Sequence, residues 1–293
     1  MRFGPALSVA LLCASCSHRL PPSAPPAAPH YVIGAAYQLD GTWHYPLEQF
    51  EYDATGLAER LPDRGGLSTD GEIADPLAMA GAHPTLQLPA IVDVTNLDNG
   101  RQIRIRLTDR GPANPGRLIG LTRKAADLLG LSDTGAIPVR VVLDSAASQA
   151  LRDRLGGAPK GLMAAPVTGV SAESLPPPGK TLSQVAGTVP QRPEALPDTG
   201  VAGTLEPLPQ TVQNVVAQPG RLWIRAGQFT SSSYANSRKN KLFGIDVRVQ
   251  HESGRRQSGY VVMAGPFASV AAADSGLALV RHAGVTDATI VVE

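Results

Sequence analysis

Apolar and polar positions alternate along residues 90–96, which read Ala-Ile-Val-Asp-Val-Thr-Asn, and again along residues 102–107, which read Gln-Ile-Arg-Ile-Arg-Leu. A period of two is typical of strands that bury one face. Asp98-Asn99-Gly100 lies between the two segments, and Asn-Gly is a strong signal for a tight hairpin turn. The pattern therefore predicts a pair of antiparallel strands.

A helical period follows these strands. Leu121, Ala125 and Leu128 recur at the spacing of one helix face, Thr122 can cap the start, and Gly130 can end the helix. Residues 137–143 are again typical of a strand. We expect residues 31–144 to form one mainly β domain with an N-terminal extension.

A second ordered region begins at Arg221. Its periodicity predicts a strand, a helix, two strands, a helix and a final strand, at residues 222–226, 232–242, 245–249, 260–264, 269–284 and 289–292. This βαββαβ order is that of ferredoxin-like α+β folds. We expect residues 221–293 to form a small α+β domain.

The remaining segments are rich in Pro, Ala, Gly, Ser and Thr. Residues 17–30 include Pro21-Pro22-Ser23-Ala24-Pro25-Pro26, and residues 145–220 have almost no aromatic side chains. Such compositions bury too little apolar surface to fold. We interpret residues 17–30 as a tether and residues 145–220 as a disordered linker.

The N-terminus has the features of a secretory signal peptide over residues 1–16. Arg2 precedes a short apolar run that is much shorter than the roughly 20 residues of a membrane span. Ala14-Ser15-Cys16 has the small residues that precede a lipidated cysteine, although Cys13 stands where Leu is usual. We expect lipidation at Cys16; an ordinary signal peptide with an incidental cysteine is the alternative.

Composition limits the classes of ligand that we expect the chain to bind. The 26 Lys and Arg nearly balance the 25 Asp and Glu, for a net charge of +1, so no basic surface indicates a nucleic acid. Both cysteines lie in the N-terminal apolar run, so neither domain contains a disulfide or a thiolate metal site. We expect no metal and no cofactor, and neutral polymers remain open as ligands.

Asp109 is the strongest candidate for acid chemistry. It directly follows the strand that ends at Leu107 and precedes a Gly111-Pro112 turn, which would hold its carboxyl group at the rim of a sheet. The neighbouring Arg110 could keep it ionised. The alternative is that Asp109 only caps the turn, a common role for Asp. His83 and Glu72 are candidates with the same ambiguity.

Five motifs in the first domain resemble the RlpA family (rare lipoprotein A) of septal-ring lytic transglycosylases. They are Thr69-Asp70-Gly71-Glu72, residues 82–89 from Ala82-His83-Pro84, residues 94–101, Thr108-Asp109-Arg110-Gly111-Pro112 and residues 125–130. The resemblance implies a six-stranded double-psi β-barrel, a fold shared with expansins. It also implies that Asp109 is the catalytic acid/base and that His83 and Glu72 line its cleft.

The implied reaction is non-hydrolytic cleavage of peptidoglycan glycan strands to 1,6-anhydro-N-acetylmuramic acid ends. Two departures from the family bear on activity. Residues 58–66 stand where family members have aromatic residues, and Gly120 replaces a common Asp.

The second domain resembles a SPOR domain, with Trp223-Ile224-Arg225-Ala226-Gly227-Gln228-Phe229 at its start and residues 260–267 on a later strand. SPOR domains bind glycan strands stripped of stem peptides. By this resemblance Trp223, Arg225 and Tyr260 are candidates for glycan binding, and core or edge packing is their alternative role.

Two hypotheses follow. The first is an endolytic lytic transglycosylase acting on peptide-free glycan at the division septum. The second is a non-catalytic, lipid-anchored glycan-binding protein that recruits septal division proteins. Both place the chain in the cell envelope, and Ser17 after Cys16 favours the periplasmic face of the outer membrane.

Overall fold

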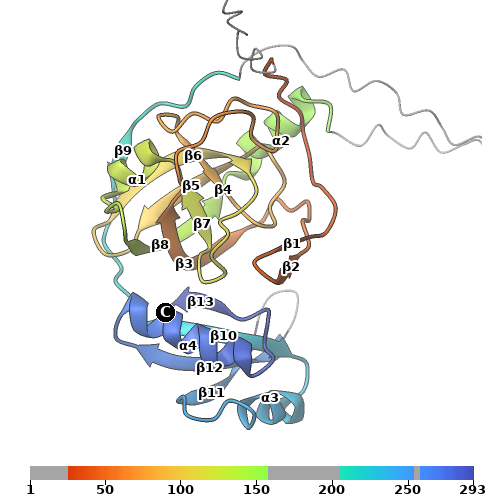
Figure 1. Ribbon diagram of the computed structural model, residues 1–293, viewed down its shortest axis with the longest axis vertical. Coiled ribbons are helices and arrows are strands. Elements are labelled where there is room, and N and C mark those ends of the chain that lie inside the picture. The colour runs from red at the N-terminus through yellow and green to blue at the C-terminus, as the bar shows by residue number, and fades with distance from the viewer. Residues whose placement is uncertain (1–25, 158–204, 254–257) are drawn as a thin grey trace, which may run out of the picture.

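The computed structural model describes residues 26–157, 205–253 and 258–293. They form a β-barrel and a smaller α+β domain that lie against each other (Figure 1). The barrel elements are β1 (Tyr37–Leu39), β2 (Thr42–His44), β3 (Asp53–Arg60), β4 (Ala80–Ala82), β5 (Ala90–Asn96), β6 (Arg101–Asp109), β7 (Ile119–Leu121), α1 (Arg123–Leu129), β8 (Ala136–Leu143), α2 (Ser145–Arg154) and β9 (Val212–Asn214). The α+β domain comprises β10 (Leu222–Phe229), α3 (Ser232–Lys239), β11 (Val247–Ser253), β12 (Ser258–Phe267), α4 (Val270–His282) and β13 (Thr289–Val292).

Six strands close the barrel in the order β4-β7-β3-β8-β5-β6, and β4 pairs back with β6. The β3–β7 and β4–β6 pairs are parallel, whereas the other pairs are antiparallel. This closed barrel of six strands confirms the double-psi fold that the family resemblance implied. Closure leaves few free strand edges.

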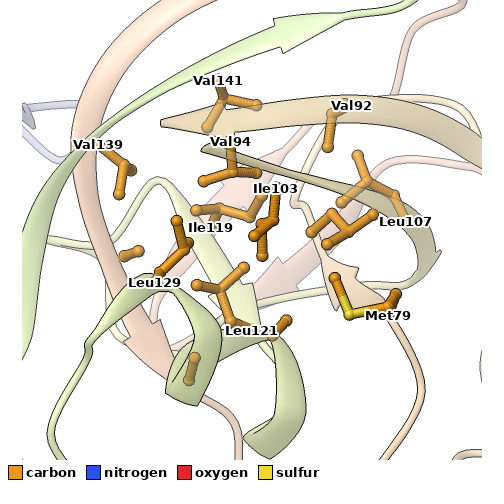
Figure 2. Close-up of a cluster of buried hydrophobic side chains, with 14 of the residues drawn as sticks. Met79, Val92, Val94, Ile103, Leu107, Ile119, Leu121, Leu129, Val139 and Val141 are labelled. Carbon is orange, nitrogen blue, oxygen red and sulfur yellow. The ribbon is translucent and has the colours of Figure 1, made fainter. Parts of the chain in front are cut away.

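The barrel interior is filled by the apolar positions of the alternating segments. Val92 and Val94 from β5 meet Ile103, Ile105 and Leu107 from β6 inside the barrel, and each is at most 1% exposed (Figure 2). The predicted hairpin joins these strands, and Gly100 has the positive φ of 73° that the turn requires. The strong period of two in the sequence therefore corresponds to the barrel core.

Helix α1 begins and ends as predicted, but Thr122 acts differently from a normal cap. Its hydroxyl donates to the carbonyls of Ala78 and Ala80, at 2.7 and 3.0 Å, instead of accepting from the helix. Gly130 ends the helix in the left-handed conformation with φ 81°. Thr122 therefore ties the helix to the segment around β4.

The prediction that residues 145–220 form a disordered linker is wrong at both ends of this range. Its first ten residues form α2, where Asp144 accepts from the amide of Ala147 at 2.9 Å and the buried Ser148 hydroxyl accepts from the amide of Ile91 at 3.0 Å. These are polar contacts, which composition does not reveal. Residues 158–204 lie outside the described residues.

The other end of that range, residues 205–218, lies along the barrel, and we call it the strap. Its strand β9 extends the sheet beyond β6, and its Leu205 is 4% exposed. Residues 28–30, assigned to the tether, also bond the barrel: the amides of Ala28 and His30 donate to the carbonyls of Gly71 and Asp70 at 3.0 and 2.8 Å. Main-chain pairing thus orders segments that have few apolar side chains.

The α+β domain has the predicted βαββαβ order and a four-stranded antiparallel sheet, β11-β12-β10-β13. Both helices pack on one face, where Ile224, Ala273 and Leu277 share a buried cluster. Arg221 and Glu293 exchange main-chain hydrogen bonds of 2.5 and 3.0 Å. The two ends of the domain therefore lie side by side.

The two domains meet along the edge strand β13 and helix α4 (Figure 1). The Thr55 hydroxyl of β3 donates to the Val292 carbonyl at 2.7 Å and accepts from its amide at 3.2 Å. The guanidinium of Arg117 binds both carboxylate oxygens of Asp274, at 2.7 and 2.9 Å. Leu57, fully buried, belongs to the core cluster of the α+β domain.

Cys16, the predicted signal peptide and residues 17–25 of the tether lie outside the described residues. Within the described ranges, none of the helices is long and apolar enough to span a membrane.

Candidate active site

A groove of about 690 Å³ opens on the barrel beside the end of β6. Its walls are residues 61–64 after β3, residues 72–81, the turn at residues 108–113, and strap residues 205–210. Among the described residues that line it, none is Trp, Tyr or Phe. The described walls of the groove therefore offer no aromatic ring on which a ligand could stack.

Asp109 is the last residue of β6, and its side chain is 16% exposed at this groove. Its Oδ1 accepts from the amides of Thr69 at 3.2 Å and Arg110 at 2.9 Å, and also from the Thr69 hydroxyl. Its Oδ2 accepts from the guanidinium of Arg64. One oxygen is thus fixed by the main chain, whereas the other is held only by a side chain.

Arg110 does not hold the carboxyl group as the sequence suggested. Its guanidinium donates instead to the main-chain carbonyls of His83, Leu86 and Ile33. Only its backbone amide reaches Asp109. The charged partner is Arg64, which is distant in sequence and therefore had no sequence signal.

Glu72 lines the same groove, but both of its oxygens are engaged. Arg106 donates to Oε1 at 2.6 Å and to Oε2 at 2.7 Å, and these side chains are only 10–12% exposed. A further nitrogen of Arg106 donates to the carbonyl of Glu206 at 3.0 Å. This ion pair therefore fastens the strap to the groove wall.

Asp70, which the sequence did not single out, is a second carboxyl group beneath this wall. It is fully buried, and its Oδ1 accepts from the Ser68 hydroxyl at 2.8 Å and the Glu72 amide at 3.1 Å. Its Oδ2 has no hydrogen-bond partner within the described structure. Burial, followed by the charge of Glu72, raises the pKa of Asp70 to about 7.

His83 is buried behind the groove, with 1% exposure. Its Nδ1 accepts from the amides of Thr85 and Leu86, at 3.2 and 3.1 Å, which assigns the ring proton to Nε2. Nε2 then donates to the Tyr52 hydroxyl at 3.0 Å. Burial lowers the pKa of His83 to about 3, so the imidazole is neutral.

The structure therefore brings Asp109 and Glu72 to one groove but not His83. The imidazole instead lines a second cavity, of about 700 Å³, between the barrel and the α+β domain. The contact of His83 with Asp109 is through the main chain, where its amide donates to the Asp109 carbonyl at 3.1 Å. The His83 side chain therefore does not line the groove that holds Asp109.

Gly120, the second departure noted in the sequence, lies on β7 under Leu61. A Cβ at this position would lie 2.4 Å from Cδ2 of Leu61. Leu61 thus occupies the space that a larger residue would need, which explains why glycine is accommodated here.

The three candidates in the α+β domain do not share one face. Trp223 lies opposite the helices with Val261 and Met263, is 7% exposed, and is covered by the guanidinium of Arg248 at 3.6 Å from its ring centre. Arg225 is partly exposed and pairs with Glu252 at 3.1 Å. Tyr260 packs against the cluster on the helix side.

The fold and site together define a double-psi β-barrel protein with a carboxyl group in an open groove, joined to a sheet-and-helix domain. Comparisons support both parts: residues 55–141 match the lytic transglycolase family model, and residues 218–291 match the SPOR domain model.

Curated relatives include proteins named endolytic peptidoglycan transglycosylase RlpA. That of Pseudomonas aeruginosa is 30% identical over 232 residues, covering 78% of this chain and 66% of the relative. That of Yersinia pestis is 40% identical over 110 residues, covering 36% and 31%, and that of Vibrio cholerae is 44% identical over 77 residues, covering 26% and 29%. The chain belongs to the RlpA family, and it spans at most 66% of the length of these three relatives.

Proposed function

We propose that this protein is an endolytic lytic transglycosylase. Its substrate would be the bond between N-acetylmuramic acid and N-acetylglucosamine in peptide-free glycan strands of peptidoglycan. The observation that carries the proposal is the Asp109 carboxyl group, which has Oδ1 fixed by two main-chain amides and Oδ2 beside a groove of about 690 Å³. The names of the relatives and the matched family model support the same chemistry.

In this mechanism Asp109 acts twice. Its protonated Oδ2 donates to the bridging oxygen as the bond from the anomeric carbon breaks, through an oxocarbenium-like transition state. The O6 hydroxyl of the muramoyl residue then attacks the same carbon and returns its proton to Asp109. The product is a 1,6-anhydro end, no water is consumed, and the acid is regenerated.

Glu72 and His83 support this step from different sides. Glu72, paired with Arg106, shapes the groove wall and holds the strap. The His83 amide would hold the carbonyl of Asp109, and its ring would hold the amides of Thr85 and Leu86 in the loop after β4. A rigid surround of this kind keeps the carboxyl group in reacting geometry.

A non-catalytic glycan-binding protein is the second candidate function. Two observations favour this non-catalytic function. The described residues of the groove wall include no aromatic side chain, and Arg64 contacts Oδ2 of Asp109. Under this hypothesis the groove would bind glycan without cleaving it, and the protein would recruit septal division proteins.

Incubation of the full chain with peptide-free glycan strands separates the two. We expect anhydro-muramoyl ends by mass spectrometry, reduced about 10²- to 10⁴-fold in Asp109→Asn, the range of general acid catalysis. Asp93→Asn is the matched control, because Asp93 also pairs with an arginine but lies outside the groove. Equal product from Asp109→Asn would exclude this residue as the acid. No product from any protein, with glycan still bound, would favour the binding function.

We further propose that the protein is exported to the cell envelope, is lipidated at Cys16 on the periplasmic face of the outer membrane, and is enriched at the septum. The SPOR domain would hold the barrel near its polymer, which raises the effective concentration to about millimolar. Trp223 and Arg225, on the sheet face away from the helices, are the proposed glycan contacts, and Tyr260 would support them by packing. To test the anchor, cells are grown with radioactive palmitate. We expect the wild type to incorporate the label and Cys16→Ala not to do so.

A further inference from the structure

Arg64 occupies the oxygen that must carry the catalytic proton. Oδ1 of Asp109 is committed to two main-chain amides and a hydroxyl, so the proton for an acid step belongs on Oδ2. The guanidinium of Arg64 donates to this oxygen. A guanidinium has no acceptor and favours the ionised carboxylate, so Arg64 must leave before Asp109 can act as an acid.

Arg64 is also the arginine of the groove that can leave most easily. Its side chain is 51% exposed, and exposed ion pairs are weak. By contrast, Arg106 is bound to Glu72 and to the strap, and the guanidinium of Arg110 is bound to three main-chain carbonyls. Arg123 is half-exposed too, but its partner is Asp63.

The departing guanidinium needs another anion of the same shape. The structure gives Arg64 one hydrogen bond to Asp109, whereas a free carboxylate can accept two parallel hydrogen bonds from an arginine, so the exchange loses none. The sugar backbone of a glycan strand carries such a group, on its lactyl substituent, only when the stem peptide has been removed, since the lactyl carboxylate is otherwise an amide. The carboxylates of a stem peptide lie beyond that amide, so a peptide-bearing strand offers Arg64 no carboxylate at the lactyl position.

We propose that Arg64 is a specificity-determining residue that couples the absence of the stem peptide to the release of Asp109. On binding a peptide-free strand, Arg64 moves from Oδ2 of Asp109 to the lactyl carboxylate, and Oδ2 takes up one proton from solvent. With a peptide-bearing strand Arg64 stays on Asp109, and the acid remains ionised. This inference rests on the proposed transglycosylase function.

The test compares two substrates with four forms of the full-length protein. The substrates are short peptide-free glycan oligomers and the same oligomers with their lactyl carboxylates converted to methyl amides. The proteins are the wild type, Arg64→Gln, Arg64→Lys and Arg104→Gln. Arg104 is a matched control because it is similarly exposed, at 46%, and pairs with Asp93 away from the groove. Binding by the SPOR domain is common to all forms, so it cancels when their substrate ratios are compared.

We expect wild type and Arg104→Gln to prefer the free acid by about tenfold or more in kcat/KM, as one hydrogen bond to a charged group supplies. Arg64→Gln should lower this preference to near unity, and Arg64→Lys should restore part of it. The role proposed for Arg64 would be overturned if the wild type showed no preference for the free acid, or if Arg64→Gln kept the wild-type preference. Either result would leave the proposed transglycosylase function standing. Absence of anhydro product from the wild type would overturn the proposed function and this inference together.

Discussion

Burial fixes the protonation state of His83. The ring is 1% exposed, its Nδ1 accepts from two main-chain amides, and its pKa of about 3 lies far below the usual value near 6.5. In the unfolded chain the same ring takes up a proton as pH falls through 6.5. The unfolded state therefore binds more protons than the folded state between pH 6.5 and 3, and stability is lost as pH falls across that window.

His83→Asn tests this linkage, since an asparagine oxygen can replace Nδ1 as the acceptor and does not titrate. The wild type should lose about 2 kcal/mol more free energy of unfolding than the variant between pH 8 and pH 5. Urea denaturation at both values measures the difference. An identical loss in both proteins would mean that the ring is not buried in its neutral form.

At this scale the sequence singled out Asp109, which the structure places at the groove, but it did not indicate the residues that contact it. Asp109 was recognisable because it ends an alternating strand before a Gly-Pro turn. Arg64 and Asp70 had no such signal, because their importance arises from contacts made by the folded chain. Periodicity places residues on elements, but it cannot give the partner that a loop residue reaches across the barrel.

The strap shows how an element with little apolar content can be ordered by its main chain. Beyond β9, the amide of Val215 donates to the carbonyl of Gly100 at 2.8 Å. A Cβ on Gly100 would lie 2.1 Å from the Val215 carbonyl oxygen, so the strap and the hairpin turn approach too closely for any other residue. The same glycine serves the turn and the docking of the strap.

Val215→Pro should release the strap, because proline has no N–H to donate to Gly100. We expect the amides of residues 212–218 to exchange with deuterium at least about tenfold faster, consistent with the loss of one or more hydrogen bonds. Val215→Ala, which keeps the N–H, is the control. Exchange unaffected by the proline would show that side-chain packing, and not this bond, holds the strap.

The sequence predicted the elements whose apolar residues recur with a strong period. It did not predict those that are held by polar or main-chain contacts. The hairpin of β5 and β6, helix α1 and the order of the α+β domain follow from alternation and capping residues. By contrast, α2 is held by Asp144 and Ser148, and β9 by an exposed edge of β6. The segment 245–249, predicted as a strand, is ordered as β11 only from Val247, since Gly244 with φ 81° forms the preceding turn.

For the molecule as a whole, the contact between the domains depends on a buried cation. The side chain of Arg117 is 9% exposed and pairs with Asp274 of α4 and, at 3.6 Å, with Glu59 of β3. Loss of Asp274 would leave a mostly buried guanidinium with a single, more distant carboxylate partner, which is costly. The Thr55 contacts to Val292 lie in the same interface.

Asp274→Ala should therefore loosen the two domains. We expect the amide of Val292, which donates to Thr55, to exchange about 10- to 100-fold faster, as the loss of hydrogen bonds to a charged group predicts. The radius of gyration from small-angle scattering should rise as well. Asp287→Ala, at an exposed position of the same domain, should change neither quantity, and equal behaviour of the two variants would argue against a docked interface.

The paired main-chain bonds between Arg221 and Glu293 have a practical consequence. A domain whose entry and exit adjoin can be spliced as a cassette into a surface loop of an unrelated carrier, because the host backbone need not stretch to accommodate it. The same adjacency makes circular permutation feasible: a short bridge would join the present ends, and new ones could be opened in the turn at residues 240–246.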